Sequence, residues 1–289
     1  MLNGNLKLAI QKNGRLTEKS LSLLRNCGLE IEDYSERLII TARNYSLDIL
    51  FLRDDDIPEY VSDGVADIGI VGEDVLYEKK SDVQVLRKLG YGKCNLSIAA
   101  PEEKKISEVN QLNGLRIATS FPNLLKKFLT ENKINAEIVE ISGSVEITPS
   151  LGVADLIFDL VSTGNTLKFN KLKKSFDVYS FQSVLIANKD ISQDPKRNGE
   201  LSDLLQRIDS ALNAKKNKYL MMNAPKTALG KIKKIVPSLS SPTILPLANE
   251  DMIAIHAVIP SEQFWEIHHE LKEAGASGIL LLPIENIIL

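Results

Sequence analysis

Short apolar runs bounded by polar turns recur along the first two thirds of the chain and predict β-strands. Runs of this length between turn residues are typical of strands buried in a parallel sheet. Segments with helical spacing lie between several of them, such as residues 17–27, 55–63 and 123–132. This alternation predicts an α/β fold with largely parallel sheets. The expected strands cover residues 6–10, 47–52, 66–71, 96–100, 115–119, 137–141, 154–161 and 180–187.

The order of these elements predicts two lobes and a third domain. A turn at residues 110–114 followed by a fresh β-α-β start indicates a second lobe, and the strand at 180–187 would return to the first. Such a crossing makes a hinged cleft. From residue 219 the pattern is β-α-β-β-α-β, the ferredoxin-like order. The expected domains are lobe I (1–100 and 180–190), lobe II (101–179), a linker helix (191–218) and a C-terminal domain (219–289).

Composition narrows the class of protein. The 289 residues are 44% hydrophobic and 25% charged, as in an ordinary globular protein, and the net charge is −3. A nearly balanced charge argues against a general binder of nucleic acid or of membrane surfaces. Cys27 and Cys94 are too few for a disulfide framework, and no apolar run approaches about 20 residues. We therefore expect a cytoplasmic protein that binds neither nucleic acid nor membrane.

Residues 140–172 carry the most informative chemistry. The turns 142–144 and 162–166 are rich in small and hydroxyl residues, and they flank the apolar run that contains Asp159. A loop of this kind after a strand can direct backbone amides and hydroxyls at one phosphate. Asp159 would then lie near the sugar or metal of a phosphorylated ligand. The alternative is a plain turn, which is the commoner meaning of such a loop taken alone.

Four more groups follow predicted strands. Lys12 and Arg15 follow the first strand and could neutralise a polyphosphate, unless they belong to a solvated turn. Arg53 is a ligand candidate, whereas the acids at 54–56 could bind a metal or cap the next helix. The turn at 69–74 would let a ligand approach the backbone, and 119–123 is either a second ligand turn or an ordinary cap.

Catalysis by a protein nucleophile is not indicated. All three histidines lie in the C-terminal domain, and no Cys or Ser arrangement suggests covalent catalysis. An enzyme built on this chain would therefore act through positioning, a metal ion and electrostatics.

With these motifs in view, the chain resembles the ATP phosphoribosyltransferase family in its long, regulated form. The resemblance spans nearly the whole length. It implies a two-lobed, periplasmic-binding-protein-like catalytic core with a C-terminal ferredoxin-like (ACT-like) regulatory domain. Members join ATP to phosphoribosyl pyrophosphate (PRPP) through adenine N1 and release pyrophosphate, with Mg²⁺ required. The motifs that carry it are LAIQKNGRL, the R-x-x-D-I-P run from Arg53, DGVADIGIVGEDVL, LNGLRIATSFPNLLKKFL, residues 140–172, and KYLMMNAP…SPTILPL…LKEAGASGILLLPIE.

The resemblance also implies site residues. Lys12, Arg15 and Arg53 would be catalytic, neutralising the leaving pyrophosphate, and no metal ligand is assigned to the protein because Mg²⁺ would be bound mainly through the substrates. The residues implied for PRPP are Ser142, Gly143, Ser144, Glu146, Asp155, Asp159, Ser162, Thr163, Gly164, Asn165 and Thr166. Those for ATP are Lys12, Arg15, Arg53, Asp56, Gly72 and Asp74.

In the third domain the resemblance implies a site for histidine as a feedback inhibitor, with assembly into dimers and hexamers. The effector residues would be Asn223, Leu239, Ser241, Thr243 and Ala276. Two other classes of protein compete with the enzyme: a solute-binding or sensor protein, since two-lobed clefts also serve those, and a non-catalytic regulatory relative. The cations at 12, 15 and 53 and the loop at 162–166 are all present, which favours the enzyme.

Overall fold

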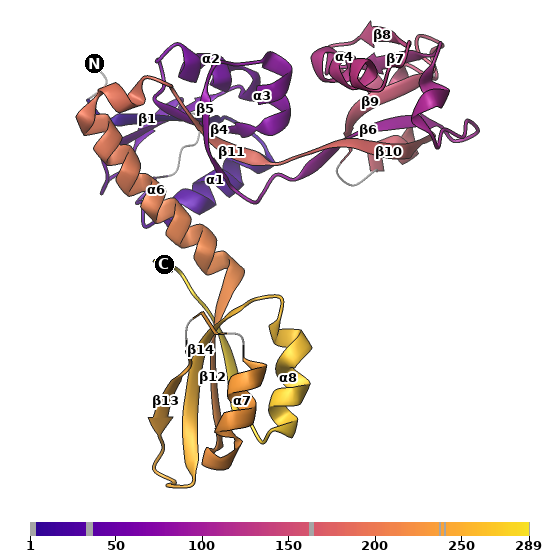
Figure 1. Ribbon diagram of the computed structural model, residues 1–289. Coiled ribbons are helices and arrows are strands. Elements are labelled where there is room, and N and C mark those ends of the chain that lie inside the picture. The colour runs from indigo at the N-terminus through magenta and orange to yellow at the C-terminus, as the bar shows by residue number, and fades with distance from the viewer. Residues whose placement is uncertain (1–3, 33–36, 162–164, 237, 240, 289) are drawn as a thin grey trace. The chain divides into compact units, whose positions relative to one another are not determined.

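A computed structural model describes residues 4–32, 37–161, 165–236, 238–239 and 241–288, and in it the side chains of residues 15 and 165 are not described. The chain divides into two compact units (Figure 1). The first comprises Met1–Leu21 with Ile31–Asn198, and the second comprises Ser22–Glu30 with Gly199–Leu289. The first unit contains two β-sheets and the second contains one.

The first sheet, which we call lobe I, has six strands in the order β2-β3-β1-β4-β11-β5. Strands β1 with β3, and β1 with β4, pair in parallel, whereas β2 and β11 pair antiparallel with their neighbours. Its strands are β1 Leu6–Gln11, β2 Ile39–Thr41, β3 Leu47–Leu52, β4 Ile68–Gly72, β5 Gln84–Lys88 and β11 Ser183–Ala187. Its helices are α1 Arg15–Asn26, α2 Ile57–Ser62, α3 Glu73–Lys79 and the 3₁₀ turn η1 Asp54–Asp56.

The second sheet, lobe II, has five strands in the order β10-β6-β9-β7-β8. Strand β7 pairs in parallel with β8 and β9, and β6 runs antiparallel between β9 and β10. Its strands are β6 Cys94–Pro101, β7 Arg116–Thr119, β8 Glu137–Glu140, β9 Leu156–Val161 and β10 Leu172–Phe181. Its helices are η2 Val109–Leu112, α4 Pro122–Glu131, η3 Val145–Ile147 and α5 Asn165–Phe169.

Apart from β2, both lobes use the same arrangement of strands. Each has three strands in parallel, then one antiparallel strand, then an edge strand, as β3-β1-β4-β11-β5 in lobe I and β8-β7-β9-β6-β10 in lobe II. The antiparallel strand of each lobe is the first strand after the chain crosses from the other lobe: β6 in lobe II and β11 in lobe I. The expected two-lobed α/β core is confirmed. The sheets are less parallel than expected: only three neighbouring strands in each lobe are parallel, and the remaining strands pair antiparallel with their neighbours.

Both sheets are covered on their two faces, which explains why their central strands are continuous apolar runs. In lobe I, α2 and α3 lie on one face and α1 on the other (Figure 1). In lobe II, one face packs against Leu125 and Phe128 of α4, and the other packs against Val145 and Leu167. Strand β3 is buried over its first five residues, and Asp48 within it accepts hydrogen bonds from Asn5 and Thr41.

The first helix begins two residues earlier than expected, and Thr17 does not cap it. Its hydroxyl instead donates to the carbonyl of Gln11, so it cannot serve as the accepting group of an N-cap. The helix is followed by Gly28, which adopts φ +78, the left-handed conformation common at helix ends.

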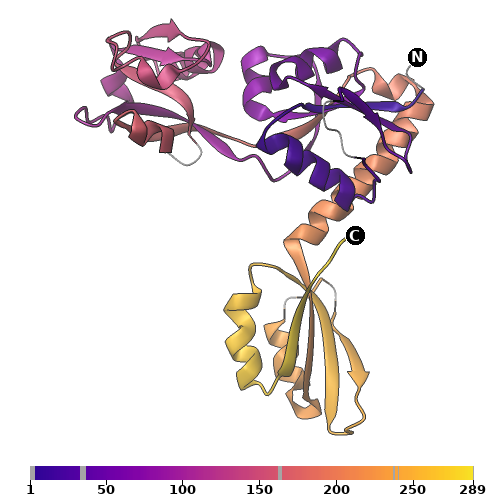
Figure 2. The ribbon, with the colours of Figure 1, turned by 180° about the vertical axis from the view of Figure 1, so that it is seen from behind.

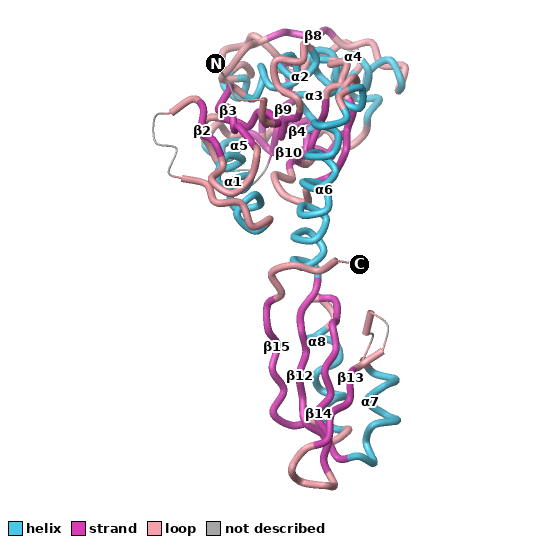
Figure 3. The backbone as a smooth tube through the Cα atoms, turned by 90° about the vertical axis from the view of Figure 1, so that its left-hand side faces the viewer, coloured by secondary structure: helices cyan, strands magenta, loops and turns pink. Residues whose placement is uncertain are grey.

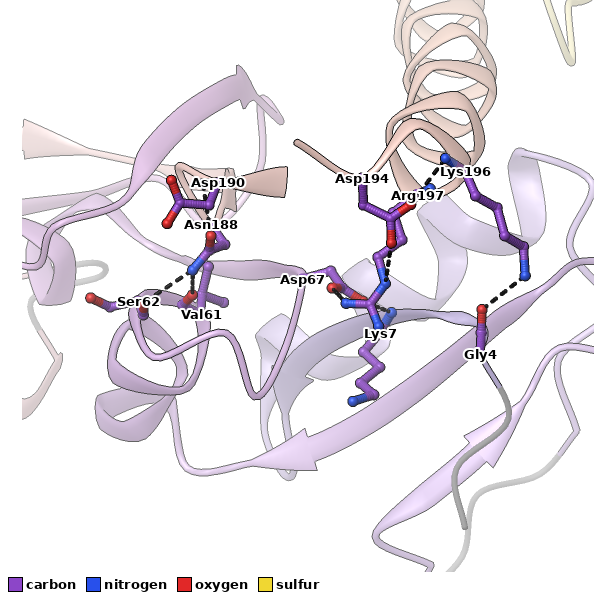
Figure 4. A network of polar contacts seen from close by, with 10 residues as sticks. All are labelled: Gly4, Lys7, Val61, Ser62, Asp67, Asn188, Asp190, Asp194, Lys196 and Arg197. Carbon is purple, nitrogen blue, oxygen red and sulfur yellow. Dashed lines mark hydrogen bonds and ion pairs between the residues drawn. The ribbon is translucent and has the colours of Figure 1, made fainter. Parts of the chain in front are cut away.

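A polar network holds the chain where it leaves lobe I (Figure 4). The buried carboxylate of Asp67 accepts a hydrogen bond from the amide of Lys7 at 2.7 Å and forms an ion pair with Arg197. The side-chain amide of Asn188 donates to the carbonyls of Val61 and Ser62 at 2.8 and 3.0 Å. These contacts lie at the amino-terminal ends of the parallel strands, opposite the loops described below.

The second unit contains a four-stranded antiparallel sheet in the order β13-β14-β12-β15, the ferredoxin-like arrangement that the sequence predicts. Helices α7 and α8 lie on one face (Figures 1 and 2), and the other face carries no helix (Figure 3). The helices are α6 Pro195–Lys216, which begins in the first unit, α7 Leu229–Ile235 and α8 Phe264–Glu273. The strands are β12 Asn217–Pro225, β13 Thr243–Pro246, β14 Met252–Pro260 and β15 Ser277–Pro283, and short 3₁₀ turns lie at η4 Ile191–Gln193 and η5 Lys226–Ala228. In the part of the chain that the structure describes, none of these helices is both long and apolar enough to cross a bilayer.

A substitution at Gly69 can show how tightly the core of lobe I is packed. A Cβ at this position would lie 2.7 Å from Cγ2 of Ile57 and 3.0 Å from Cγ2 of Val61, both buried. We expect Gly69→Ala to lower the free energy of unfolding by about 1–3 kcal/mol, because the added methyl group overpacks the core. Chemical denaturation measures this. The matched control Gly4→Ala, at an exposed position, should change it by less than about 0.5 kcal/mol, and an equal effect of both would contradict the packing argument.

Candidate active site

All six sequence-predicted groups of the core follow parallel strands at their carboxyl ends. In lobe I they follow β1 (residues 12–15), β3 (53–56) and β4 (72–74), and in lobe II they follow β7 (120–123), β8 (141–146) and β9 (162–166). Parallel pairing puts the three groups of each lobe at one edge of its sheet, the edge where open α/β sheets bind ligands. The loop at 162–164 itself lies outside the described residues.

A pocket of about 600 Å³ lies where loops of the two lobes meet. It brings together Asp74 and Ser142, for which the family resemblance implies contacts with ATP and PRPP respectively. Lys12, Arg53 and Asp56 do not line it. The lining residues are Asp54, Asp55, Asp74, Val75, Glu78, Lys79, Ser120, Phe121, Pro122, Asn123, Glu140, Ile141, Ser142 and Leu160.

The wall from lobe I is acidic. Burial raises the pKa of Asp74 above its usual range, and the charges of Asp54 and Asp55 raise it further. Burial likewise raises the pKa of Asp54, with a contribution from Asp55. Gly72 lies beside this wall, since a Cβ there would lie 2.1 Å from a carboxylate oxygen of Asp74. Carboxylates gathered in this way suit a metal-bound phosphate or an N–H donor, not a bare anion.

The predicted cations lie at the same edge of lobe I. The amide of Lys12 donates to the carbonyl of Leu52 at 2.7 Å, so Lys12 lies beside the residue that precedes Arg53. Both side chains are exposed, and that of Arg15 is not described. Asp56 occupies the N-cap position of α2 without a side-chain capping bond, so the capping role expected for these acids is not seen there.

In lobe II the structure brings Glu146 and Asp159 together. Asp159 lies on the face of β9 that packs against Val145, next to the turn at 142–144, where Ser144 adopts φ 52. Burial raises the pKa of Asp159, and the charge of Glu146 raises it further. Ser142, Gly143 and Ser144 are exposed in this turn, and so is Thr166 in α5, as a phosphate-binding loop would require.

Asp155 does not join this pair. It precedes β9, and its carboxylate accepts hydrogen bonds from the backbone and the guanidinium of Arg116 at 2.9 and 3.3 Å. That contact holds the pKa of Asp155 below its usual range. Four residues of strand, about 13 Å, separate it from Asp159. The ion pair and this spacing place Asp155 toward the amino-terminal edge of the sheet, so the geometry does not support its predicted position beside Asp159.

The pocket also contains residues that no sequence motif identified. Glu78 and Lys79 line it, and neither of them follows a strand in a recognisable turn. The turn at 119–123 was ambiguous between a cap and a ligand site. Phe121 occupies the N-cap position without a side-chain bond, and Ser120 and Asn123 line the pocket, so this geometry favours the ligand site.

Comparison with known proteins decides the family. A family model described as ATP phosphoribosyltransferase matches residues 53–210, more than half of the chain, and a model described as HisG, C-terminal domain, matches residues 214–286. The chain belongs to the ATP phosphoribosyltransferase family. The first match contains both pocket walls, and the second covers the ferredoxin-like domain.

Relatives support this membership along the whole chain. ATP phosphoribosyltransferase of Cytophaga hutchinsonii is 48% identical over 283 residues, covering 98% of both chains. That of Bacteroides thetaiotaomicron is 44% identical over 283 residues, covering 98% of this chain and 99% of the relative. A solved structure, the ATP phosphoribosyl transferase (HisG:HisZ) complex from Thermotoga maritima, matches with a TM-score of 0.57 and 32% identity, covering 71% of this chain and 98% of that chain.

The five predicted effector residues of this family member do not all share one surface. Asn223 of β12 and Thr243 of β13 alternate with the core residues Met222 and Ile244, so both point to the sheet face without helices. Leu239 and Ser241 are exposed in the segment before β13. Ala276 is buried in the core of this domain, so its side chain does not reach the open face.

The raised pKa of Asp159 can be tested in solution by substituting this residue. Its pKa is raised in the folded state, so ionising it costs stability, and this cost appears as pH rises through the folded pKa. We expect Asp159→Asn to be more stable than the wild type at pH 8 and to lose that advantage toward pH 4. Urea denaturation across this range measures the difference. The solvated control Asp63→Asn should show no such trend, and a stability difference for Asp159→Asn that does not change with pH would contradict the argument.

Proposed function

We propose that this chain transfers the 5-phosphoribosyl group of PRPP to N1 of ATP, giving phosphoribosyl-ATP and pyrophosphate, the first step of histidine biosynthesis. The observation that carries this proposal is that the charge of Glu146 acts on the partly buried Asp159 toward the carboxyl end of β9, in a chain that belongs to the family. In this proposal the loop at 162–166 holds the 5′-phosphate of PRPP, and the two carboxylates face the ribose.

The reaction requires little covalent chemistry from the protein. The N1–C1′ bond forms while the bond from C1′ to the pyrophosphate oxygen breaks, and its electron pair leaves with pyrophosphate. Positive charge develops on the ribose, and in this proposal the carboxylates of Glu146 and Asp159 stabilise it. Adenine N1 is already a nucleophile. The thiol of Cys94 is not needed as one, and burial raises its pKa to about 11, so it is protonated at neutral pH.

Mg²⁺ fits the acidic wall as a substrate-borne ion. Among the described residues, no three His, Cys, Asp or Glu side chains are placed to hold a metal ion together. Mg²⁺ commonly takes one or two carboxylates and completes its shell with phosphate oxygens and water. Asp54, Asp55 and Asp74 could supply such contacts to a metal-bound polyphosphate. Lys12, Arg15 and Arg53 would neutralise phosphate charge at the same edge of lobe I.

Regulation is proposed for the second unit. Histidine would bind near Asn223 and Thr243 on the sheet face without helices, and it would act by favouring one of two arrangements of the subunits. We propose a homo-oligomer, a dimer or hexamer, as the working form, in the cytoplasm where ATP and PRPP are available.

The direct test combines the purified protein with ATP, PRPP and Mg²⁺ and follows the ultraviolet change that accompanies N1 substitution. We expect product from the wild type. Glu146→Gln should lower kcat/KM by about 100-fold, because a charge that stabilises the transition state is lost. Glu137→Gln, at an exposed position on β8, is the matched control and should be near wild type. A folded wild-type protein that forms no product would contradict the proposed reaction.

Histidine should slow the same reaction. Asn223→Ala should raise the concentration needed for half-inhibition by about 10-fold, because a hydrogen bond to a charged ligand is lost. Uninhibited activity should stay unchanged, since residue 223 lies outside the catalytic unit. Lys233→Ala on α7 serves as the control and should leave inhibition intact. Equal inhibition of wild type and Asn223→Ala would move the effector site elsewhere.

A further inference from the structure

Helix α4 of lobe II is capped by a carboxylate from lobe I. The helix starts with Pro122, which has no N–H group, and its N-cap residue Phe121 makes no side-chain capping bond. The next two amides, of Asn123 and Leu124, donate to the two carboxylate oxygens of Glu78 at 2.9 Å each. Glu78 lies near the end of α3, so one side chain satisfies two free amides of a helix in the other lobe.

Two further bonds reinforce this contact. The side-chain amide of Asn123 donates to the carbonyl of Glu78 at 3.1 Å. The ammonium group of Lys80 donates to the side-chain oxygen of Asn123 at 2.9 Å. Lys80 ends α3 in the left-handed conformation, with φ 53, which turns the chain at this point. Four hydrogen bonds therefore join the end of α3 to the start of α4.

The contact lies directly at the candidate active site. Glu78 and Asn123 both line the pocket of about 600 Å³ that holds Asp74 and Ser142. Asn123 also lines a second pocket of about 780 Å³, whose wall includes Tyr77, Lys80 and Lys126. The Glu78–Asn123 contact thus lies between two spaces that both lobes line. It sets the separation of the walls of the first pocket.

We propose that Glu78 is a positioning residue for the phosphoribosyl transfer, a proposal that rests on the proposed function. Its carboxylate holds the lobe II wall, residues 120–123 and 142, against the acidic lobe I wall. Charge-assisted bonds to backbone amides are stronger than neutral ones, and the positive end of α4 adds to the attraction. The resident carboxylate therefore holds the lobes in the arrangement in which one pocket presents Asp74 and Ser142 together.

This role predicts a particular kinetic pattern. Without the contact, a smaller fraction of the molecules has the two walls in the binding-competent arrangement. The apparent affinity of every ligand that needs both walls falls in proportion to that fraction. The KM values for ATP and PRPP should rise by the same factor, while kcat changes little, because binding is weakened uniformly. A residue that contacts only one substrate would change only one KM.

The experiment compares Glu78→Ala, Glu78→Gln and the control Glu131→Ala, which removes an exposed carboxylate from the far end of α4. We expect Glu78→Ala to raise both KM values by about 10-fold at nearly constant kcat. Glu78→Gln, whose single amide oxygen is an uncharged acceptor, should give a smaller rise in both. Glu131→Ala should match the wild type.

Amide hydrogen exchange provides a readout that does not depend on activity. In the full-length protein, peptides containing Asn123 and Leu124 should exchange about 10-fold faster in Glu78→Ala than in wild type, since both amides lose their acceptor. If the protein has no transferase activity but the two amides exchange faster in Glu78→Ala, the Glu78 contact is supported and only the proposed function is overturned. Unchanged exchange would overturn the contact. Faster exchange with unchanged KM values, a change in one KM only, or a large fall in kcat would overturn the positioning role.

Discussion

Parallel pairing of three strands in each lobe is the constraint on which the rest of the catalytic unit depends. Strand β1 pairs with β3 and β4, and β7 pairs with β8 and β9, so six loops leave the two sheets at their carboxyl edges. The turns that the sequence predicts as ligand sites lie at those edges. The antiparallel strands β6 and β11 extend the sheets without changing which edge carries the loops.

Partly buried acids gather toward the carboxyl edges of both sheets. Burial raises the pKa values of Asp54, Asp74 and Asp159, and neighbouring acids raise them further. By contrast, Asp67 and Asp155, which directly precede β4 and β9, are paired with arginines. Unpaired acids in a cleft cost stability, and they are placed where a metal-bound polyphosphate or a developing positive charge would offset that cost. Structural and functional carboxylates are thus distinguished by their partners.

The sequence predicts much of this arrangement, because strands buried on both faces leave a clear apolar signal. The bounds of β3 agree with the predicted ones. Strand β5 was missed because most of its residues are partly or fully exposed and polar. Glu78 was missed because its partners lie 45 residues away, at a helix whose own cap position is filled by Phe121. Contacts of this length follow from how the lobes meet, which no local pattern encodes.

The most direct test of the account is a crystal structure of the protein with PRPP and Mg²⁺ bound. We expect the 5′-phosphate at residues 162–166, with the ribose hydroxyls within hydrogen-bond distance of Asp159 and Glu146, and the pyrophosphate directed toward the lobe I edge that carries Arg53. A PRPP molecule whose phosphate binds at the loop after β1, with its ribose away from Asp159, would contradict the assignment of lobe II as the phosphoribosyl site.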